Sequence, residues 1–416
     1  MTKRLLARVA TTLLCILALR LAPAVAQQLS APNYGAELAA IDARISSLKK
    51  RVAAHPSDWL IKQHLGTALL ERATLSGSLI DMQHADEAIQ DAVSSAPKGS
   101  GPLLLAARFQ FSVHRLGQAS AFLDQIESRP LVKEDERLAV LALRADIAFQ
   151  RGEYDTALAG YQQCETISPA LCSEKLMLFY AKTGRNAEAE ALSDKILKSI
   201  AEKNPRARAW VLLQAGIRSL QQRRYSEALE RLREADASFA GWWLVREHIA
   251  EVLSLQSQDT LAIPIYQEVI EQTNLPQYLD ALAECYERAG RTKDAAALFE
   301  RADNLWREQL KAYPESAAGH AVEHFLAFGD NRSVAVELAE KNFANRPGGD
   351  ARVLLAEAYL KTGRLKDAHQ QVQALLASPY RTGDAIEVAL ETCLAVGDKA
   401  SASKLQEMTS QPPLLS

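Results

Sequence analysis

The sequence predicts an all-α protein built as a continuous array of short helix–turn–helix repeats. Gly and Pro number only 19 and 15 in 416 residues, and aromatic residues make up 6%, which favours helices over a large β-sheet. A spacing of small and apolar residues also recurs along most of the chain. Because no Gly-, Ser- or Pro-rich linker separates the recurrences, we expect one array over residues 59–409.

The first 26 residues have the layout of a secretory signal peptide. Basic residues precede an apolar run over residues 9–19, and Ala24 and Ala26 occupy the small-residue positions of a cleavage site. We expect cleavage after Ala26, a periplasmic or secreted mature protein, and no membrane span after signal removal. An uncleaved anchor is the alternative, although the apolar run is short for a membrane helix.

The net charge argues against one class of partner. The segment over residues 1–26 holds four basic residues and no acidic one, so its removal leaves 44 basic and 51 acidic residues, a net charge of −7. General nucleic-acid binding requires concentrated positive charge. We therefore expect no nucleic-acid partner.

Four cysteines follow the signal segment. Cys164 and Cys172 flank Pro169 at a predicted turn, and the sequence allows either a local disulfide or two buried packing residues. Cys285 and Cys393 are far apart and are predicted to be core thiols. Their spacing does not indicate a zinc site, and we expect neither a metal nor a cofactor.

Residues 36–54 form a predicted amphipathic helix ahead of the repeats. Apolar residues recur there at steps of three and four, as on one face of a helix. Because the ends of a repeat array need a cover, we expect this helix to cap the first repeat.

The clearest repeat has Ala283, Tyr286, Gly290 and Ala295 at fixed spacing. The same spacing returns at Ala356, Tyr359, Gly363 and Ala368. This pattern resembles the tetratricopeptide repeat (TPR), a 34-residue helix–turn–helix unit. The resemblance covers residues 59–409 and implies a right-handed superhelical α-solenoid of about ten repeats, in which small residues let paired helices approach closely.

Three segments depart from the regular repeat. The first unit has about seven extra residues around 74–80, which we expect to lengthen the connection between its two helices. Residues 303–316 should extend the second helix of the seventh unit. Residues 410–416 form a short C-terminal tail beyond the array.

The TPR resemblance also predicts an inner surface. In that family the first helix of each repeat lines the concave face, and the residue after the small packing residue points into the groove. In the C-terminal half these positions form what we call the acidic row: Glu251, Glu284, Glu323, Glu357 and Glu391. We expect these carboxylates to be exposed on one concave side, either as a site for a basic partner segment or as an ordinary solvated face.

The middle of the predicted groove is apolar instead. Trp210, Leu213 and Ile217 fall at groove positions of the fifth unit, next to groove positions of the fourth. Such a stripe could anchor an apolar partner side chain, or a tight superhelix could bury it. The sequence leaves both interpretations open.

One short string suggests catalysis. Residues 320–324 read His320-Ala-Val-Glu323-His324, the inverted zinc-peptidase signature, in which two histidines bind zinc and Glu323 acts as the base. The string lies inside the eighth repeat, where the register turns both imidazoles away from the groove towards solvent. A zinc hydrolase is therefore a distant alternative.

We expect a non-catalytic, extracytoplasmic scaffold whose concave groove binds a protein or peptide partner, a basic segment among the candidates. A repeat array presents a long binding surface, which favours this interpretation. A platform for the assembly or export of envelope polymers is the alternative within the same class.

Overall fold

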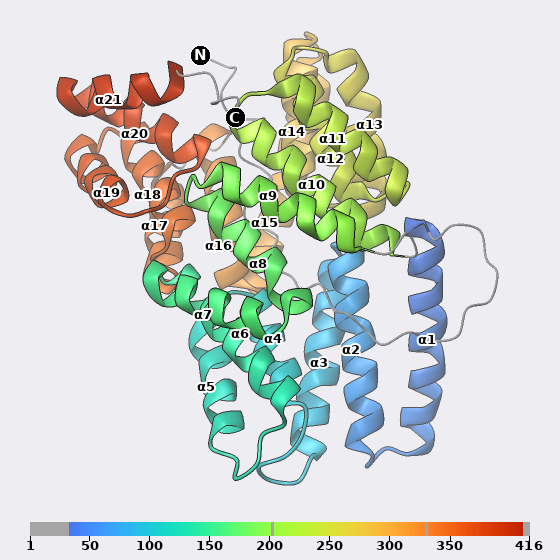
Figure 1. Ribbon diagram of the computed structural model, residues 1–416. Coiled ribbons are helices and arrows are strands. Elements are labelled where there is room, and N and C mark those ends of the chain that lie inside the picture. The colour runs from blue at the N-terminus through green and yellow to red at the C-terminus, as the bar shows by residue number, and fades with distance from the viewer. Residues whose placement is uncertain (1–32, 201–203, 329–331, 411–416) are drawn as a thin grey trace.

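The computed structural model describes residues 33–200, 204–328 and 332–410, so the predicted signal peptide and most of the predicted tail lie outside the described residues. Within these ranges the chain forms 21 α-helices (Figure 1). They are α1 Tyr34–Ala54, α2 Trp59–Ser76, α3 Leu79–Ser95, α4 Leu103–Ser112, α5 Leu116–Glu127, α6 Glu134–Gln150, α7 Tyr154–Ile167, α8 Pro169–Lys182, α9 Asn186–Ser199, α10 Pro205–Gln221, α11 Tyr225–Ser238, α12 Trp243–Leu255, α13 Asp259–Thr273, α14 Pro276–Arg288, α15 Thr292–Ala312, α16 Pro314–Ala327, α17 Arg332–Asn345, α18 Gly349–Lys361, α19 Leu365–Ala377, α20 Gly383–Val396 and α21 Lys399–Ser410.

From α2 onwards the helices pack as ten successive pairs, from α2 with α3 to α20 with α21. Small residues lie where the paired helices cross: Ala283 on α14 and Ala295 on α15 are both completely buried. A Cβ atom on Gly216 of α10 would lie 2.8 Å from the Leu232 side chain of α11, so only glycine allows that approach. The all-α solenoid predicted from the repeat pattern is confirmed.

Helix α1 covers the first pair. Its apolar side buries Ile41, Ile45 and Leu48 in the main hydrophobic core. The N-terminal end of α1 also contacts a segment outside the first repeat. The backbone N–H of Tyr34 donates to the Ala240 carbonyl at 3.2 Å, so α1 also ties the first pair to the end of α11.

The extra residues of the first repeat lengthen its helices rather than the connection between them. Helix α2 continues to Ser76 and α3 begins at Leu79, so the expectation of a longer connection is wrong. Gly77 makes the turn with φ of +70°, a conformation that favours glycine. The added helical turn carries the end of α2 to α12, where the Trp243 indole N–H donates to the Leu75 carbonyl at 2.8 Å. In contrast, α15 runs to Ala312, which agrees with the predicted extension of the seventh unit.

The array winds tightly enough that its second half contacts its first. In each contact the C-terminal end of a first helix in the first five pairs meets a segment of the last five pairs, and we call this set of contacts the seam. In Figure 1 the orange helices α16 to α18 lie next to the green helices α6 to α8. Four hydrogen bonds to backbone carbonyls cross the seam: Trp243 to Leu75, Asn345 to His114, Gly348 to Gln150, and Arg381 to Lys182. Three ion pairs also cross it: Arg115 with Glu315, Lys182 with Asp350, and Arg223 with Glu387.

Glycine allows the closest backbone approach in the seam. A Cβ atom on Gly383, at the start of α20, would lie 2.3 Å from the Gln221 carbonyl oxygen at the end of α10. Because that neighbour is backbone, it cannot swing aside as a flexible side chain would. Any larger residue at this position must therefore push the last pair away from the fifth.

A disulfide joins α7 and α8 across their short connection. Cys164 and Cys172 are bonded, with their Cα atoms 5.8 Å apart, so of the two interpretations the structure has the bridge. Cys285 and Cys393 are free and buried. No helix among the described residues is both long and apolar enough to cross a membrane.

Candidate functional site

The first helices of the C-terminal pairs carry the acidic row, but they do not expose it as a row. Glu251 on α12 is 1% exposed and Glu357 on α18 is 5% exposed, whereas Glu284, Glu323 and Glu391 are half-buried. The expectation that these carboxylates are solvent-exposed is therefore wrong for Glu251 and Glu357. The cause is the tight winding, which packs neighbouring first helices against one another on their inner sides.

Two members of the acidic row share a cation. Lys361 Nζ pairs with Glu357 Oε1 at 2.8 Å, and the same lysine acts electrostatically on Glu284 of α14. Asp280 and Glu287 add negative charge around Glu284.

Glu284 is only weakly compensated by its neighbours. Its Oε2 atom has no hydrogen-bond partner, and the nearest guanidinium atom, Arg288 Nη1, lies 3.7 Å away. Arg288 is instead held by Asp259, with Nη2 2.7 Å from Oδ1. Burial, reinforced by Asp280 and Glu287, raises the pKa of Glu284 to about 7 against the opposing effect of Arg288. A nearby positive charge would lower this pKa and favour the ionised carboxylate.

Helix α12 carries a buried triad of titratable residues that the sequence analysis did not identify as a unit. His248 Nδ1 lies 3.0 Å from Glu251 Oε2, and His248 Nε2 lies 3.1 Å from Glu247 Oε1. All three residues are at most 1% exposed, and Glu247 Oε1, His248 Nε2 and Glu251 Oε1 lack well-aligned hydrogen-bond partners. Burial raises the pKa of Glu247 to about 8, while the two carboxylates raise the pKa of His248 against the effect of burial.

The spacing of the two acidic residues in the sequence could have indicated this triad. Glu247 and Glu251 are four residues apart and so lie on one helical face, within a segment that is otherwise mostly apolar. Acids on the buried side of an amphipathic pattern mark a functional or energetically costly position. Only the packing of α12 against its neighbours shows that both carboxylates are enclosed.

The His320–His324 string does not assemble into the predicted zinc site. His324 is 3% exposed, and its Nδ1 lies 2.9 Å from Asp280 Oδ1 on α14. The His320 ring instead stacks on Trp306, with ring centroids 6.4 Å apart, and burial together with Arg346 lowers its pKa to about 4. The expectation that both imidazoles face solvent is wrong, because α16 is enclosed by α14 and α15 on one side and by the seam on the other.

The apolar stripe of the fifth unit is part of the packing. Leu213 is completely buried, and Trp210 and Ile217 are half-buried against the main hydrophobic core. Of the two interpretations left open, burial by a tight superhelix agrees with the structure. Asp146, the acidic groove position of the third pair, is also enclosed, and it accepts a hydrogen bond from Tyr161 Oη at 2.9 Å and pairs with Lys175.

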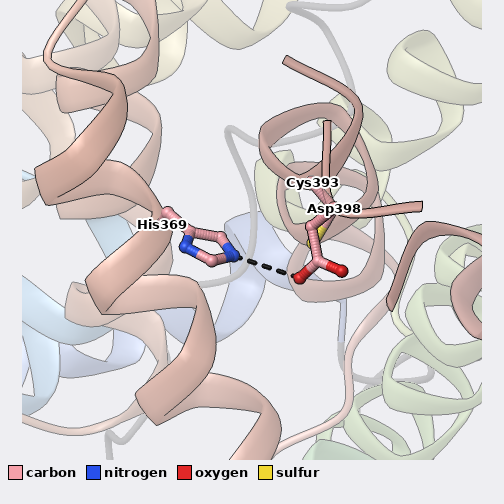
Figure 2. A group of neighbouring side chains, drawn as sticks. All are labelled: His369, Cys393 and Asp398. Atoms are coloured by element: carbon pink, nitrogen blue, oxygen red, sulfur yellow. Dashed lines mark hydrogen bonds and ion pairs between the residues drawn. The ribbon is translucent and has the colours of Figure 1, made fainter. Parts of the chain in front are cut away.

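Two groups of side chains among the described residues offer three metal-ligating atoms within 4.8 Å of one another. One is the α12 triad. The other consists of His369, Cys393 and Asp398 near the C-terminal end of the array, where Figure 2 shows the His369 ring directed at the Asp398 carboxylate. Neither group includes a histidine of the 320–324 string, so the described structure contains no three-ligand site there.

No family model matches the chain. A segment of 134 residues, 30% of the chain, is 27% identical to the Photosystem I assembly protein Ycf3 of Prochlorococcus marinus strains MIT 9303 and MIT 9313, and covers 78% of that protein.

Solved structures with a similar chain trace include a thermophilic TPR protein of Thermus thermophilus, with 19% identity, 47% of this chain and 99% of that chain covered, and a TM-score of 0.36. A Rap protein complexed with Competence and Sporulation Factor has 14% identity, coverage of 78% and 98%, and a TM-score of 0.48. The chain therefore folds as an all-α solenoid of ten helix pairs, with small residues where paired helices cross, which is the architecture that the TPR resemblance of its sequence predicts.

Proposed function

We propose that this protein is an extracytoplasmic scaffold that binds a protein or peptide partner, and that the partner carries a basic segment. The observation that carries the proposal is the state of Glu284 on the inner side of α14. It is half-buried, its Oε2 atom has no hydrogen-bond partner, and its pKa is raised to about 7. A Lys or Arg side chain of a partner placed against the accessible edge of Glu284 would add positive charge to that of Arg288 and favour the ionised carboxylate.

The half-buried members of the acidic row extend this site. Glu323 on α16 and Glu391 on α20 remain partly accessible, so together with Glu284 on α14 a partner can reach acids on three first helices of the C-terminal half. Glu251 and Glu357 are buried and lie next to His248 and Lys361 respectively, so they are not part of the accessible site. Charge complementarity of this kind mainly accelerates association and selects between partners.

Two observations support a location outside the cytoplasm. The sequence of residues 1–26 has the layout of a signal peptide, and Cys164 and Cys172 form a disulfide, a bond that persists in oxidising compartments. A fusion of the full chain to a reporter enzyme active only after export tests the location. Reporter activity that depends on residues 1–26 is expected, and full activity of a cytoplasmic reporter fusion would contradict it.

Binding is tested in two steps. Crosslinking mass spectrometry in a native extract identifies the partner, and its affinity is then measured for the wild type and for Glu284→Gln with Glu323→Gln. We expect about tenfold weaker binding, equivalent to about 1.4 kcal/mol, with a difference that shrinks as salt rises because screening acts over about 8 Å at physiological ionic strength.

A matched control distinguishes an effect of the proposed binding site from an effect of the overall net charge. Glu300 and Glu308 on α15 are both exposed, so Glu300→Gln with Glu308→Gln makes the same change in net charge away from the site. Equal loss of binding in both double variants would show that overall charge, rather than the inner side of α14 and α16, governs association. Unchanged binding in the Glu284 and Glu323 variant would overturn the proposed site.

A further inference from the structure

Three chemically different side chains meet near the C-terminal end of the array. His369 comes from α19, Cys393 from α20, and Asp398 from the turn before α21 (Figure 2). One ligating atom from each lies within 4.8 Å of the other two, and His369 Nε2 is 3.2 Å from Asp398 Oδ2. Helix α19, helix α20 and the turn before α21 thus bring an imidazole nitrogen, a thiol sulfur and a carboxylate oxygen close together.

The backbone orients the carboxylate of this group. Asp398 Oδ1 accepts a hydrogen bond from the Ser401 N–H at 3.1 Å, and the Asp398 N–H donates to the Cys393 carbonyl at 2.9 Å. One carboxylate oxygen therefore caps α21, and the other is left directed at His369. Such outer contacts hold a metal ligand in place before the metal arrives.

A fourth donor lies beside the three. Gln373 Nε2, one turn further along α19, is 3.0 Å from His369 Nε2 and 3.3 Å from Asp398 Oδ2. Its side-chain amide can rotate to present the carbonyl oxygen instead of the amino group. The fourth tetrahedral position can accordingly be filled by this oxygen or by water.

The donor set determines the class of ion. Thiolate and imidazole ligands favour zinc and similar borderline divalent ions, whereas calcium and magnesium prefer oxygen ligands alone. Cys393 is completely buried, while the side chains of His369 and Asp398 are 32% and 23% exposed, which leaves a route from solvent. The α12 triad differs, since it has no thiol and all its ligands come from one buried helix.

We propose that His369, Cys393 and Asp398 form a binding site for a divalent ion of the zinc class, with Gln373 or water as the fourth ligand. Binding replaces the thiol proton of Cys393 by the metal and releases that proton to solvent. The ion would link α19, α20 and α21 and so fasten the last pair to the array.

The test uses Co²⁺ as the probe on the reduced, metal-free full chain. A thiolate bound to Co²⁺ gives a charge-transfer absorption band in the near ultraviolet, and tetrahedral coordination gives strong visible bands. We expect one equivalent of Co²⁺ to produce both, one equivalent of Zn²⁺ to remove them, and Zn²⁺ to raise the melting temperature. Wild-type protein without a charge-transfer band would overturn the proposal.

Substitutions identify which residues bind the Co²⁺ ion. Cys393→Ser should abolish the charge-transfer band, whereas Cys285→Ser, at the other free buried thiol, should retain it. Asp398→Asn should weaken Co²⁺ binding at least tenfold while keeping the helix cap, because Asn caps as well as Asp. A band that survives Cys393→Ser, or Co²⁺ binding without any thiolate band, would place the metal elsewhere and refute the assignment.

Folding of the variants does not confound the result. His369 is half-buried at the surface, so His369→Ala should retain the wild-type circular dichroism spectrum and still lose at least tenfold in Co²⁺ affinity. If Cys393→Ser does not fold, the wild-type spectrum and His369→Ala decide the question. Wild-type affinity in folded His369→Ala would refute the site.

Discussion

Replacing Glu247 by Gln should stabilise the protein at alkaline pH and leave its stability nearly unchanged at pH 5. Glu247 is completely enclosed on α12, next to His248 and Glu251, and burial raises its pKa to about 8. Gln has nearly the same shape as protonated Glu and cannot ionise. The variant therefore keeps the neutral form that the folded protein favours over most of the physiological pH range.

The sign and size of the effect follow from proton linkage. Between its ordinary pKa of 4.5 and the folded value of about 8, the folded state binds more protons than the unfolded state, so stability falls as pH rises. The full pKa difference corresponds to at most about 5 kcal/mol. Rearrangement and water entry around the ionised group reduce this, and we expect Glu247→Gln to gain about 1–3 kcal/mol at pH 8.5.

Two neighbouring groups act in the same direction. The pKa of His248 is raised by Glu247 and Glu251 in spite of burial, so its contribution to stability is present below its ordinary pKa of 6.5 and is lost as pH rises through the folded value. Burial raises the pKa of Glu284 to about 7, which also makes stability fall with rising pH. The wild type should therefore be more stable at pH 5 than at pH 8.5.

Urea unfolding monitored by circular dichroism at pH 5, 7 and 8.5 measures the free energy of unfolding as a function of pH. The wild-type free energy of unfolding should decrease with pH, and that of Glu247→Gln should decrease less. Glu300→Gln, at an exposed position of α15, serves as the control and should follow the wild type. Parallel pH profiles for wild type and Glu247→Gln would refute the reasoning, because they would mean that Glu247 is already ionised in the folded protein.

Three further predictions concern packing. Ala283→Leu should cost about 1–3 kcal/mol in thermal or urea unfolding, because the completely buried Ala283 leaves no room for a larger side chain; a negligible effect would mean that this helix crossing is looser than described. Gly383→Val should loosen the seam and increase the radius of gyration in X-ray scattering, since its Cβ would meet the Gln221 carbonyl; an unchanged radius would contradict a rigid seam. Removing the disulfide by Cys164→Ala with Cys172→Ala should lower stability by about 2–3 kcal/mol, as expected for closing a short loop; an equal loss from Cys285→Ala alone would point to packing instead.

The fold was largely predictable because each repeat is a local unit. Small residues such as Ala283 and Ala295 recur at fixed spacing, and that spacing indicates helix pairs without any knowledge of distant contacts. The extra residues of the first unit were placed in the connection rather than in the helices for the same reason. Whether the extra residues around Gly77 form a loop or longer helices depends on the contact between Leu75 and Trp243, which are 168 residues apart along the chain.

The inner surface was less predictable because burial there depends on how tightly the superhelix winds. The repeat register places Glu251, Glu284 and Glu357 on first helices, and this part needs only local spacing. Whether those carboxylates meet solvent depends on small differences in the rotation from each pair to the next, which add up over ten pairs. No single repeat carries that information, so the burial of Glu251 and Glu357 appears only in the complete array.

We expect the seam and the buried triad to be coupled, because both involve α12. Trp243 donates across the seam to the Leu75 carbonyl, and Glu247 lies one helical turn further along the same face. Ionisation of Glu247 would favour a state in which water reaches α12, and we expect opening of the Trp243–Leu75 contact to admit water to this helix. Rising pH and a loosened seam should therefore promote each other, since each lowers the free energy cost of the other. The buried acids should thus make the closed form of the array more stable at mildly acidic pH, whereas the ionised form of Glu284 that a basic partner would bind forms as pH rises through about 7.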